Sequence, residues 1–188
     1  MTKIDKMRRI EGVLFLAAFA ACIPLANFMI GNVGTFCVPN GPCVIPVAPG
    51  LTAPSGVLLV GLALVLRDLV QRRLGLSWAF VAIIVGTGLS TTFTAPSLAL
   101  ASAVAFLTSE IVDLVVYTPL QKRGLIVAAI SSSVAGLVVD SIAFLWLAFG
   151  TLDFLAGQVV GKLIMVIAVI PALYLLRNRD MKIGLTPA

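Results

Sequence analysis

Four charged side chains lie within long apolar stretches of the sequence, where they could bind a substrate or pair with each other. Glu110 and Asp113 share one apolar stretch, Asp140 lies in the next, and Lys162 lies in the last. Charged groups are costly inside a membrane, so those that occur there usually pair with one another or mark a transport pathway. These four residues are the first candidates for a functional site.

Glu110 has no obvious partner in the sequence, and two uses are open to it. A protonated carboxyl group can donate a hydrogen bond to a nearby carbonyl oxygen, whereas an ionised one facing a cavity can accept two parallel hydrogen bonds from a flat, guanine-like heterocycle. Aromatic residues could stack on such a ring, although most aromatic residues in spans serve packing or interface anchoring. The aromatic candidates are Phe93, Phe106, Phe144 and Trp146.

Asp113 lies three residues after Glu110 and therefore shares its helix face. It is expected to form a structural ion pair with Arg67 or Arg72, which should lie at a similar depth. Asp68 belongs to the same predicted group of structural charges.

Asp140 and Lys162 are expected at a common depth in the outer half of the membrane. They can form a pair that only fixes helix register, because the cost of desolvation can cancel the Coulomb gain. Alternatively, one or both can point into a substrate cavity. The sequence leaves both interpretations open.

The cysteines and the lack of histidine limit the chemistry. Cys37 and Cys43 bracket a proline-containing turn and can form a disulfide that stiffens a lid, or remain two free thiols. Cys22 is predicted to be a small packing residue. Because histidine is absent and there are only three cysteines, we predict no metal site and no cofactor.

Composition predicts a polytopic membrane protein. Of 188 residues, 60% are apolar and 11% charged, against about a quarter charged in soluble domains. The apolar stretches recur along the whole length, and each approaches the roughly 20 residues that a helix needs to cross the bilayer core. We expect a single all-helical domain over residues 1–188.

The expected elements are six transmembrane helices and one long outer loop. The third helix is predicted to lose helical character within residues 86–92, short of a full crossing. The loop, residues 31–54, is rich in glycine and proline. The predicted spans cover residues 10–30, 55–73, 77–86, 94–118, 125–149 and 155–176.

The basic residues predict the orientation. With the N-terminus inside, the lysines and arginines of the tails and of the loops after the second and fourth spans are all cytoplasmic, as the positive-inside rule requires. Lys162 alone is left over, inside the sixth span. The net charge of +5 therefore reflects topology and not nucleic-acid binding, and both termini are predicted to be cytoplasmic.

Four segments, residues 67–75, 109–113, 131–141 and 161–163, together resemble the queuosine precursor transporter family, also called vitamin uptake transporter-like. The resemblance covers about residues 55–176. Asp113, Asp140 and Lys162 match family positions, as do Asp68, Arg72 and Gly75, whereas Glu110 stands where an amide is usual. The resemblance implies six helices akin to the substrate-binding components of energy-coupling-factor transporters, and uptake of 7-deazaguanine precursors of queuosine.

We therefore expect a transporter of a small heterocycle in the cytoplasmic membrane, with Glu110, Asp140 and Lys162 around the site. No Walker-type phosphate loop occurs, so energy would come from a gradient or from a separate ATP-driven module. Ala17 and Ala21 have the small-xxx-small spacing that would suit a partner helix of such a module. A membrane-embedded enzyme and a structural assembly partner are the alternatives from other classes, and we predict no enzymatic activity.

Overall fold

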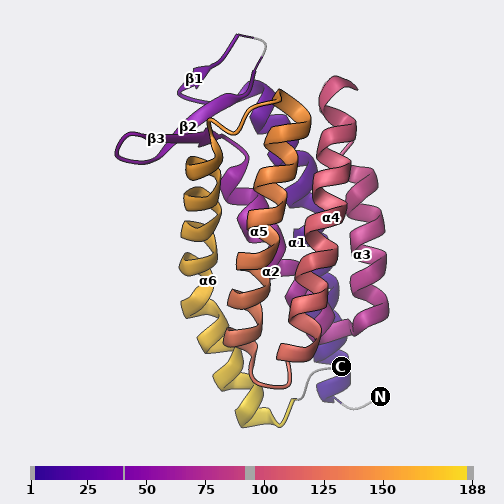
Figure 1. Ribbon diagram of the computed structural model, residues 1–188. Helices are drawn as coiled ribbons and strands as arrows, with labels where there is room; N and C mark the ends of the chain where they lie inside the picture. Colours follow the sequence, from indigo (N-terminus) through magenta and orange to yellow (C-terminus); the bar gives the residue numbers. More distant parts are fainter. Residues whose placement is uncertain (1–2, 40, 92–95, 186–188) are drawn as a thin grey trace.

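The computed structural model describes residues 3–39, 41–91 and 96–185, in which six helices pack into an elongated bundle (Figure 1). The fifth predicted helix has the predicted bounds, and the others differ at their ends. The helices are α1 (Lys3–Asn32), α2 (Val57–Leu74), α3 (Leu76–Leu89), α4 (Pro96–Leu120), α5 (Leu125–Phe149) and α6 (Leu155–Ile183).

Helices α1 and α6 both extend further than predicted at the end of the bundle where the chain begins and ends. Helix α1 starts seven residues before the predicted residue 10, and α6 continues seven residues past residue 176. An acid at each of these ends binds Arg73 of α2. Glu11 follows the added segment of α1 and Asp180 lies within that of α6, and each has a carboxylate oxygen 2.8 Å from an Arg73 nitrogen. Side-chain pairing keeps these turns helical although their sequence is polar.

Helix α3 is short, as predicted, but it does not end at Gly86. It runs to Leu89 and has 14 residues, or about 21 Å of helical rise against a bilayer core of about 30 Å. Gly86 is instead a packing residue, because a Cβ atom there would lie 2.7 Å from the Phe106 ring of α4.

Residues 31–54 were predicted to be a loop, and this prediction was wrong. They contain a three-stranded antiparallel sheet in the order β1 (Phe36–Cys37), β2 (Cys43–Ala48) and β3 (Leu51–Pro54). The sheet sits at the end of the bundle opposite the start of α1 and the end of α6 (Figure 1). The all-helical fold class is therefore incomplete.

Proline did not prevent this sheet from forming. Pro46 pairs with Thr52 of β3, whereas β1 reaches only Cys43 and Val44 of β2. On the side of β2 that faces β1, Pro46 therefore has no paired residue. It also lies next to a register irregularity between residues 46 and 48. Edges and bulges are where a strand tolerates a residue without an N–H group.

Cys37 and Cys43 face each other across β1 and β2 and are joined by a disulfide bond. Their Cα atoms are 3.8 Å apart. The bond closes the turn between the two strands. Cys22 is a buried free thiol in α1.

In the described residues, α1, α4, α5 and α6 are long and apolar enough to cross a membrane. Helix α2 is not, because its 18 residues include Arg67, Asp68, Arg72 and Arg73, and α3 is too short. Many large apolar side chains on the outside of the bundle are exposed, as expected for a surface that faces lipid. Length and composition thus support a multi-pass membrane protein with at least four crossings.

Glycines allow α6 to pack directly on the backbone of its neighbours. A Cβ atom on Gly157 would lie 1.9 Å from the carbonyl oxygen of Thr52 in β3. One on Gly61 of α2 would lie 2.8 Å from the carbonyl oxygen of Lys162. Close contact with β3 and α2 therefore fixes the first two turns of α6.

We predict that Gly157→Ala destabilises the protein, because the methyl group would overlap a backbone oxygen that cannot move without displacing β3. Overpacking of this kind typically costs about 1–3 kcal/mol. The melting temperature of the purified protein in detergent measures the effect. Gly88→Ala is the matched control, since its Cβ atom would have no neighbour within 4 Å; equal melting temperatures of the two variants would contradict the prediction.

Candidate functional site

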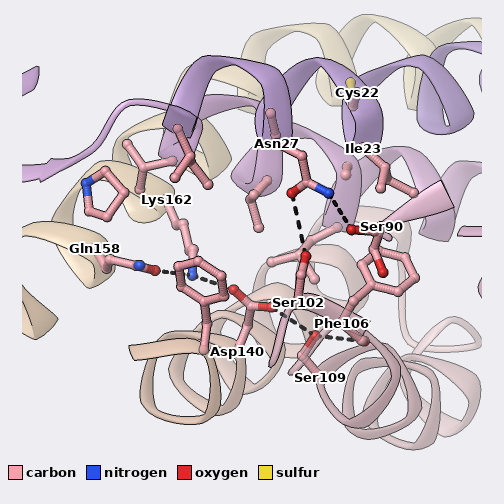
Figure 2. Close-up of a pocket in the computed structure, with 18 of the residues that line it drawn as sticks. Cys22, Ile23, Asn27, Ser90, Ser102, Phe106, Ser109, Asp140, Gln158 and Lys162 are labelled. Atoms are coloured by element: carbon pink, nitrogen blue, oxygen red, sulfur yellow. Dashed lines mark hydrogen bonds and ion pairs between the residues drawn. The ribbon is translucent and has the colours of Figure 1, made fainter. Parts of the chain in front are cut away.

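A cavity lies inside the bundle on the side of the sheet, between α1, α2, α4, α5 and α6 (Figure 2). Water-sized molecules can be centred in about 50 Å³ of it, several times the roughly 10–15 Å³ that one water needs. It therefore has room for more than one water molecule. Its polar and aromatic lining residues are Asn27, Ser90, Ser102, Phe106, Ser109, Glu110, Asp140, Phe144, Gln158 and Lys162.

Lys162 forms an ion pair with Asp140 at one side of the cavity. Its Nζ atom lies 2.5 Å from Asp140 Oδ2, 2.6 Å from Gln158 Oε1 and 2.8 Å from Ser141 Oγ. An ammonium group has three N–H donors, and these three acceptors use all of them. We call these four residues the lysine cluster.

The two interpretations that the sequence left open for Asp140 and Lys162 are both consistent with this geometry. The residues pair, and both also line the cavity. Because the Lys162 donors are engaged, its main effect is to hold and compensate the Asp140 carboxylate. The second Asp140 oxygen accepts a long hydrogen bond of 3.4 Å from Ser109 Oγ, and it is the more available binding group.

The opposite side of the cavity carries a neutral polar group that the sequence did not reveal. Asn27 of α1 donates a hydrogen bond to the backbone oxygen of Ser90, and its own side-chain oxygen accepts one from Ser102 of α4 (Figure 2). All three residues are buried. The cavity therefore has an amide on one wall and a carboxylate on the other.

Two of the four aromatic candidates line the cavity. Phe106 and Phe144 are both buried there, in α4 and α5. Phe106 also contacts the Phe19 ring, with centroids 6.0 Å apart, so it has a packing role as well. Phe93 lies outside the described residues, and Trp146 is exposed on the outside of α5.

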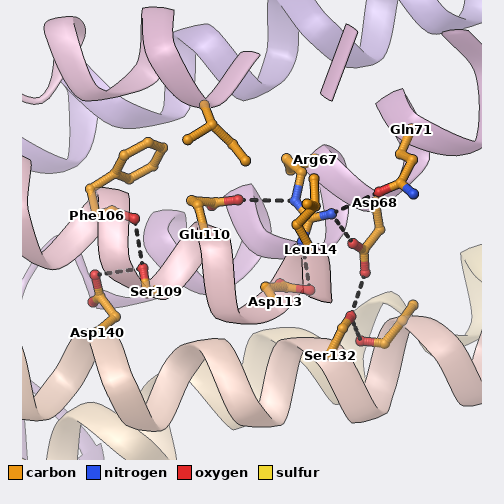
Figure 3. A network of polar contacts seen from close by, with 12 residues as sticks. Arg67, Asp68, Gln71, Phe106, Ser109, Glu110, Asp113, Leu114, Ser132 and Asp140 are labelled. Atoms are coloured by element: carbon orange, nitrogen blue, oxygen red, sulfur yellow. Dashed lines mark hydrogen bonds and ion pairs between the residues drawn. The ribbon is translucent and has the colours of Figure 1, made fainter. Parts of the chain in front are cut away.

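Glu110, for which the sequence offers no obvious partner, has one in the structure. Its Oε2 atom lies 3.0 Å from Nε of Arg67, while the residue also lines the cavity (Figure 3). The same guanidinium group binds Asp68 at 3.0 Å and Asp113 at 2.6 Å. We call these four residues the arginine cluster. The sequence could not show the Glu110 contact because it depends on how α2 rotates against α4.

Asp113 pairs with Arg67, which was one of its two expected partners. The other, Arg72, belongs to a group at the end of the bundle where the chain begins and ends, and its Nη2 atom lies 3.2 Å from Asp180. Arg72 lies five residues beyond Arg67, so the helix turns it toward α6 instead of α4. We call this second group the terminal cluster: Glu11, Arg72, Arg73, Arg179 and Asp180.

Three further residues make buried polar contacts in the structure, and the sequence contains only weak indications of them. Gln158 precedes Lys162 by four residues, which puts both on one face of α6. Asn27 is a lone amide in an apolar stretch. Asp180 was assigned to a cytoplasmic tail, although it is buried and bound by two arginines.

Residues 90–176 match the protein family described as "Putative vitamin uptake transporter". This segment is slightly less than half of the chain; it includes Glu110, Asp140 and Lys162, and it leaves out Arg67 and Asp68. The chain matches no curated protein and no solved structure. The match and the long apolar helices together indicate a multi-pass membrane protein with a transport role for a small molecule.

We predict that Lys162→Met lowers the melting temperature, because it leaves the Asp140 carboxylate buried without its cation. Breaking one side of a buried pair typically costs about 3–5 kcal/mol. The double variant Asp140→Asn, Lys162→Met should recover most of the loss, since neither charge remains. Lys122→Met, at an exposed turn position, is the control; a double variant no more stable than Lys162→Met would argue against the pair.

Proposed function

We propose that this protein carries a small heterocyclic compound across the cytoplasmic membrane and binds it in the cavity between the Asn27 and Asp140 walls. The observation that carries the proposal is a buried cavity with carboxylate acceptors, the side-chain amides of Asn27 and Gln158, and two phenylalanine rings. Small-molecule sites typically combine apolar and aromatic walls with a few fixed polar groups. The family match supports the same role.

The polar residues of the cavity have separate tasks in this proposal. Asp140 accepts hydrogen bonds from the substrate, and Lys162 keeps that carboxylate charged and oriented. Asn27 both donates and accepts on the facing wall. Phe106 and Phe144 supply the apolar contacts to the ring.

The finer proposal is a 7-deazaguanine precursor of queuosine as the substrate. A guanine-like ring presents two adjacent N–H donors on one edge, and a carboxylate can accept both in parallel. Asp140 and Glu110 are the two acids that line the cavity. This preference for a donor edge distinguishes deazaguanines and guanine from adenine, which lacks it.

We further propose one transmembrane domain over residues 1–188, with six crossings and both termini cytoplasmic. The start of α1 and the end of α6 lie at the same end of the bundle (Figure 1), which supports an even number of crossings. No Lys or Arg occurs in residues 31–54, which supports an outer position for the sheet. The disulfide fits an oxidising outer compartment.

A substrate-binding component of an ATP-driven transporter is the second candidate function. Ala17 and Ala21 are exposed on the outer face of α1, where a partner helix could approach closely. Uptake that requires the host's coupling module would favour this candidate. Uptake by the purified protein alone in liposomes would exclude it.

The first test is binding of the purified protein to 7-deazaguanine, guanine, adenine, biotin, riboflavin and thiamine, measured by calorimetry. We expect 7-deazaguanine to bind, and Asp140→Asn to weaken binding at least tenfold, because the new amide places a donor where an acceptor is needed. Asp153→Asn, an exposed acid outside the cavity, should bind within about twofold of wild type, like other surface changes.

Two outcomes distinguish a wrong substrate from a wrong transport function. Binding of a vitamin in place of 7-deazaguanine would contradict the substrate and keep the transport role. No binding of any compound by a well-folded protein, together with no uptake by cells that express it, would contradict the proposed function. Size-exclusion profiles of each variant show whether a loss of binding comes from misfolding.

A further inference from the structure

The arginine cluster contains more acids than its single cation can neutralise. Each of the three guanidinium nitrogens of Arg67 contacts a different carboxylate: Nε contacts Glu110, Nη1 contacts Asp68 and Nη2 contacts Asp113 (Figure 3). Every one of these side chains is at most 1% exposed. Three ionised carboxylates around one guanidinium group would leave a net charge of −2 inside the bundle.

No other described cation is positioned to balance this charge. Lys162 is bound to Asp140, and Arg72 and Arg73 are bound to Asp180. The remaining neighbours of the cluster are neutral: Gln71, Thr118, Tyr117 and Ser132. A buried carboxylate without a counter-charge takes up a proton, because the neutral form costs much less to bury.

Asp113 gives an independent sign of a missing proton. Its Oδ2 atom is buried and unpaired among the described residues, because the Ser132 hydroxyl beside it donates its proton to Asp68. The Asp113 and Asp68 carboxyl groups also lie close together, because both contact the Arg67 guanidinium group. Two carboxyl groups can form a hydrogen bond only when one of them is protonated, because ionised carboxylates have acceptors alone.

Glu110 connects this cluster to the cavity. It lines the cavity and binds Arg67 through Oε2. Its neighbour Ser109 donates to Asp140, so the arginine cluster and the lysine cluster meet on α4. A change in the charge of Glu110 therefore alters the electrostatic environment of both the Asp140 side of the cavity and Arg67.

We infer that the arginine cluster is a proton-binding site, and that its protons couple substrate movement to the proton gradient through Glu110. A proton from the outer water enters by the cavity and binds a Glu110 oxygen, and the neutral carboxyl group holds Arg67 Nε less strongly. The same O–H bond then breaks, and the proton passes to the inner water. No other covalent bond is made or broken. Sodium fits less well, because the guanidinium group occupies the centre that a metal ion would need. The inference rests on the proposed transport function for its coupling step alone.

The proton site itself is tested without any substrate. Infrared spectra of the purified protein at neutral pH should show the carbonyl band of protonated carboxyl groups. Glu110→Gln, Asp113→Asn and Asp68→Asn should each change this band, while Asp153→Asn should leave it unchanged. A wild-type spectrum without the band, or one that none of the three cluster variants alters, would overturn the inference whether or not the protein transports anything.

The coupling is tested in liposomes with 7-deazaguanine, or with whichever compound of the binding panel binds. An inward proton gradient should raise accumulation several-fold, and a sodium gradient should not. Glu110→Gln should lose this gradient-driven accumulation, whereas Asp113→Asn, at a cluster acid outside the cavity lining, should keep exchange of labelled for unlabelled compound. Accumulation that depends on the sodium gradient, or on neither gradient, would refute the coupling and leave the proposed function intact. Accumulation by the Glu110→Gln variant that still depends on the proton gradient would refute the role of Glu110.

Discussion

The structure depends on one buried guanidinium group, that of Arg67, which holds α2 and α4 together through two acids of α4, Glu110 and Asp113, and also contacts Asp68 of its own helix. In the interior of an apolar bundle such a charge is tolerated only with close partners. Its position fixes the rotation of both helices. Ser132 of α5 joins through Asp68, so the same contact also orients the helix that carries Asp140.

The polar residues form three clusters along the bundle axis, and the first two are linked through Ser109 and Glu110 of α4. The lysine cluster lines the cavity beneath the sheet, the arginine cluster lies further in, and the terminal cluster joins α1, α2 and α6 at the far end. The terminal cluster is the most densely paired, with Asp180 bound by Arg72 and Arg73. The end of the bundle opposite the cavity is thus held together by several ion pairs between α1, α2 and α6.

The sequence predicted the helices better than the contacts between them. The length of the apolar stretch predicted both ends of α5 correctly, and the common depth expected for Asp140 and Lys162 suggested that they pair. The partner of Glu110 depended on helix rotation, which spacing along one helix does not contain. The sheet was missed because Gly and Pro suggested a loop, whereas pairing across the Cys37–Cys43 turn and an edge position for Pro46 compensated for them.

The direct contact between Gly157 and Thr52 has a mechanical consequence. With no side chain between them, the sheet and the start of α6 cannot slide past each other, and a displacement of one must carry the other with it. Gln158 follows Gly157 directly, and Lys162 lies little more than one turn further on. A displacement of the three-stranded sheet would therefore also displace Lys162, the cation that holds Asp140.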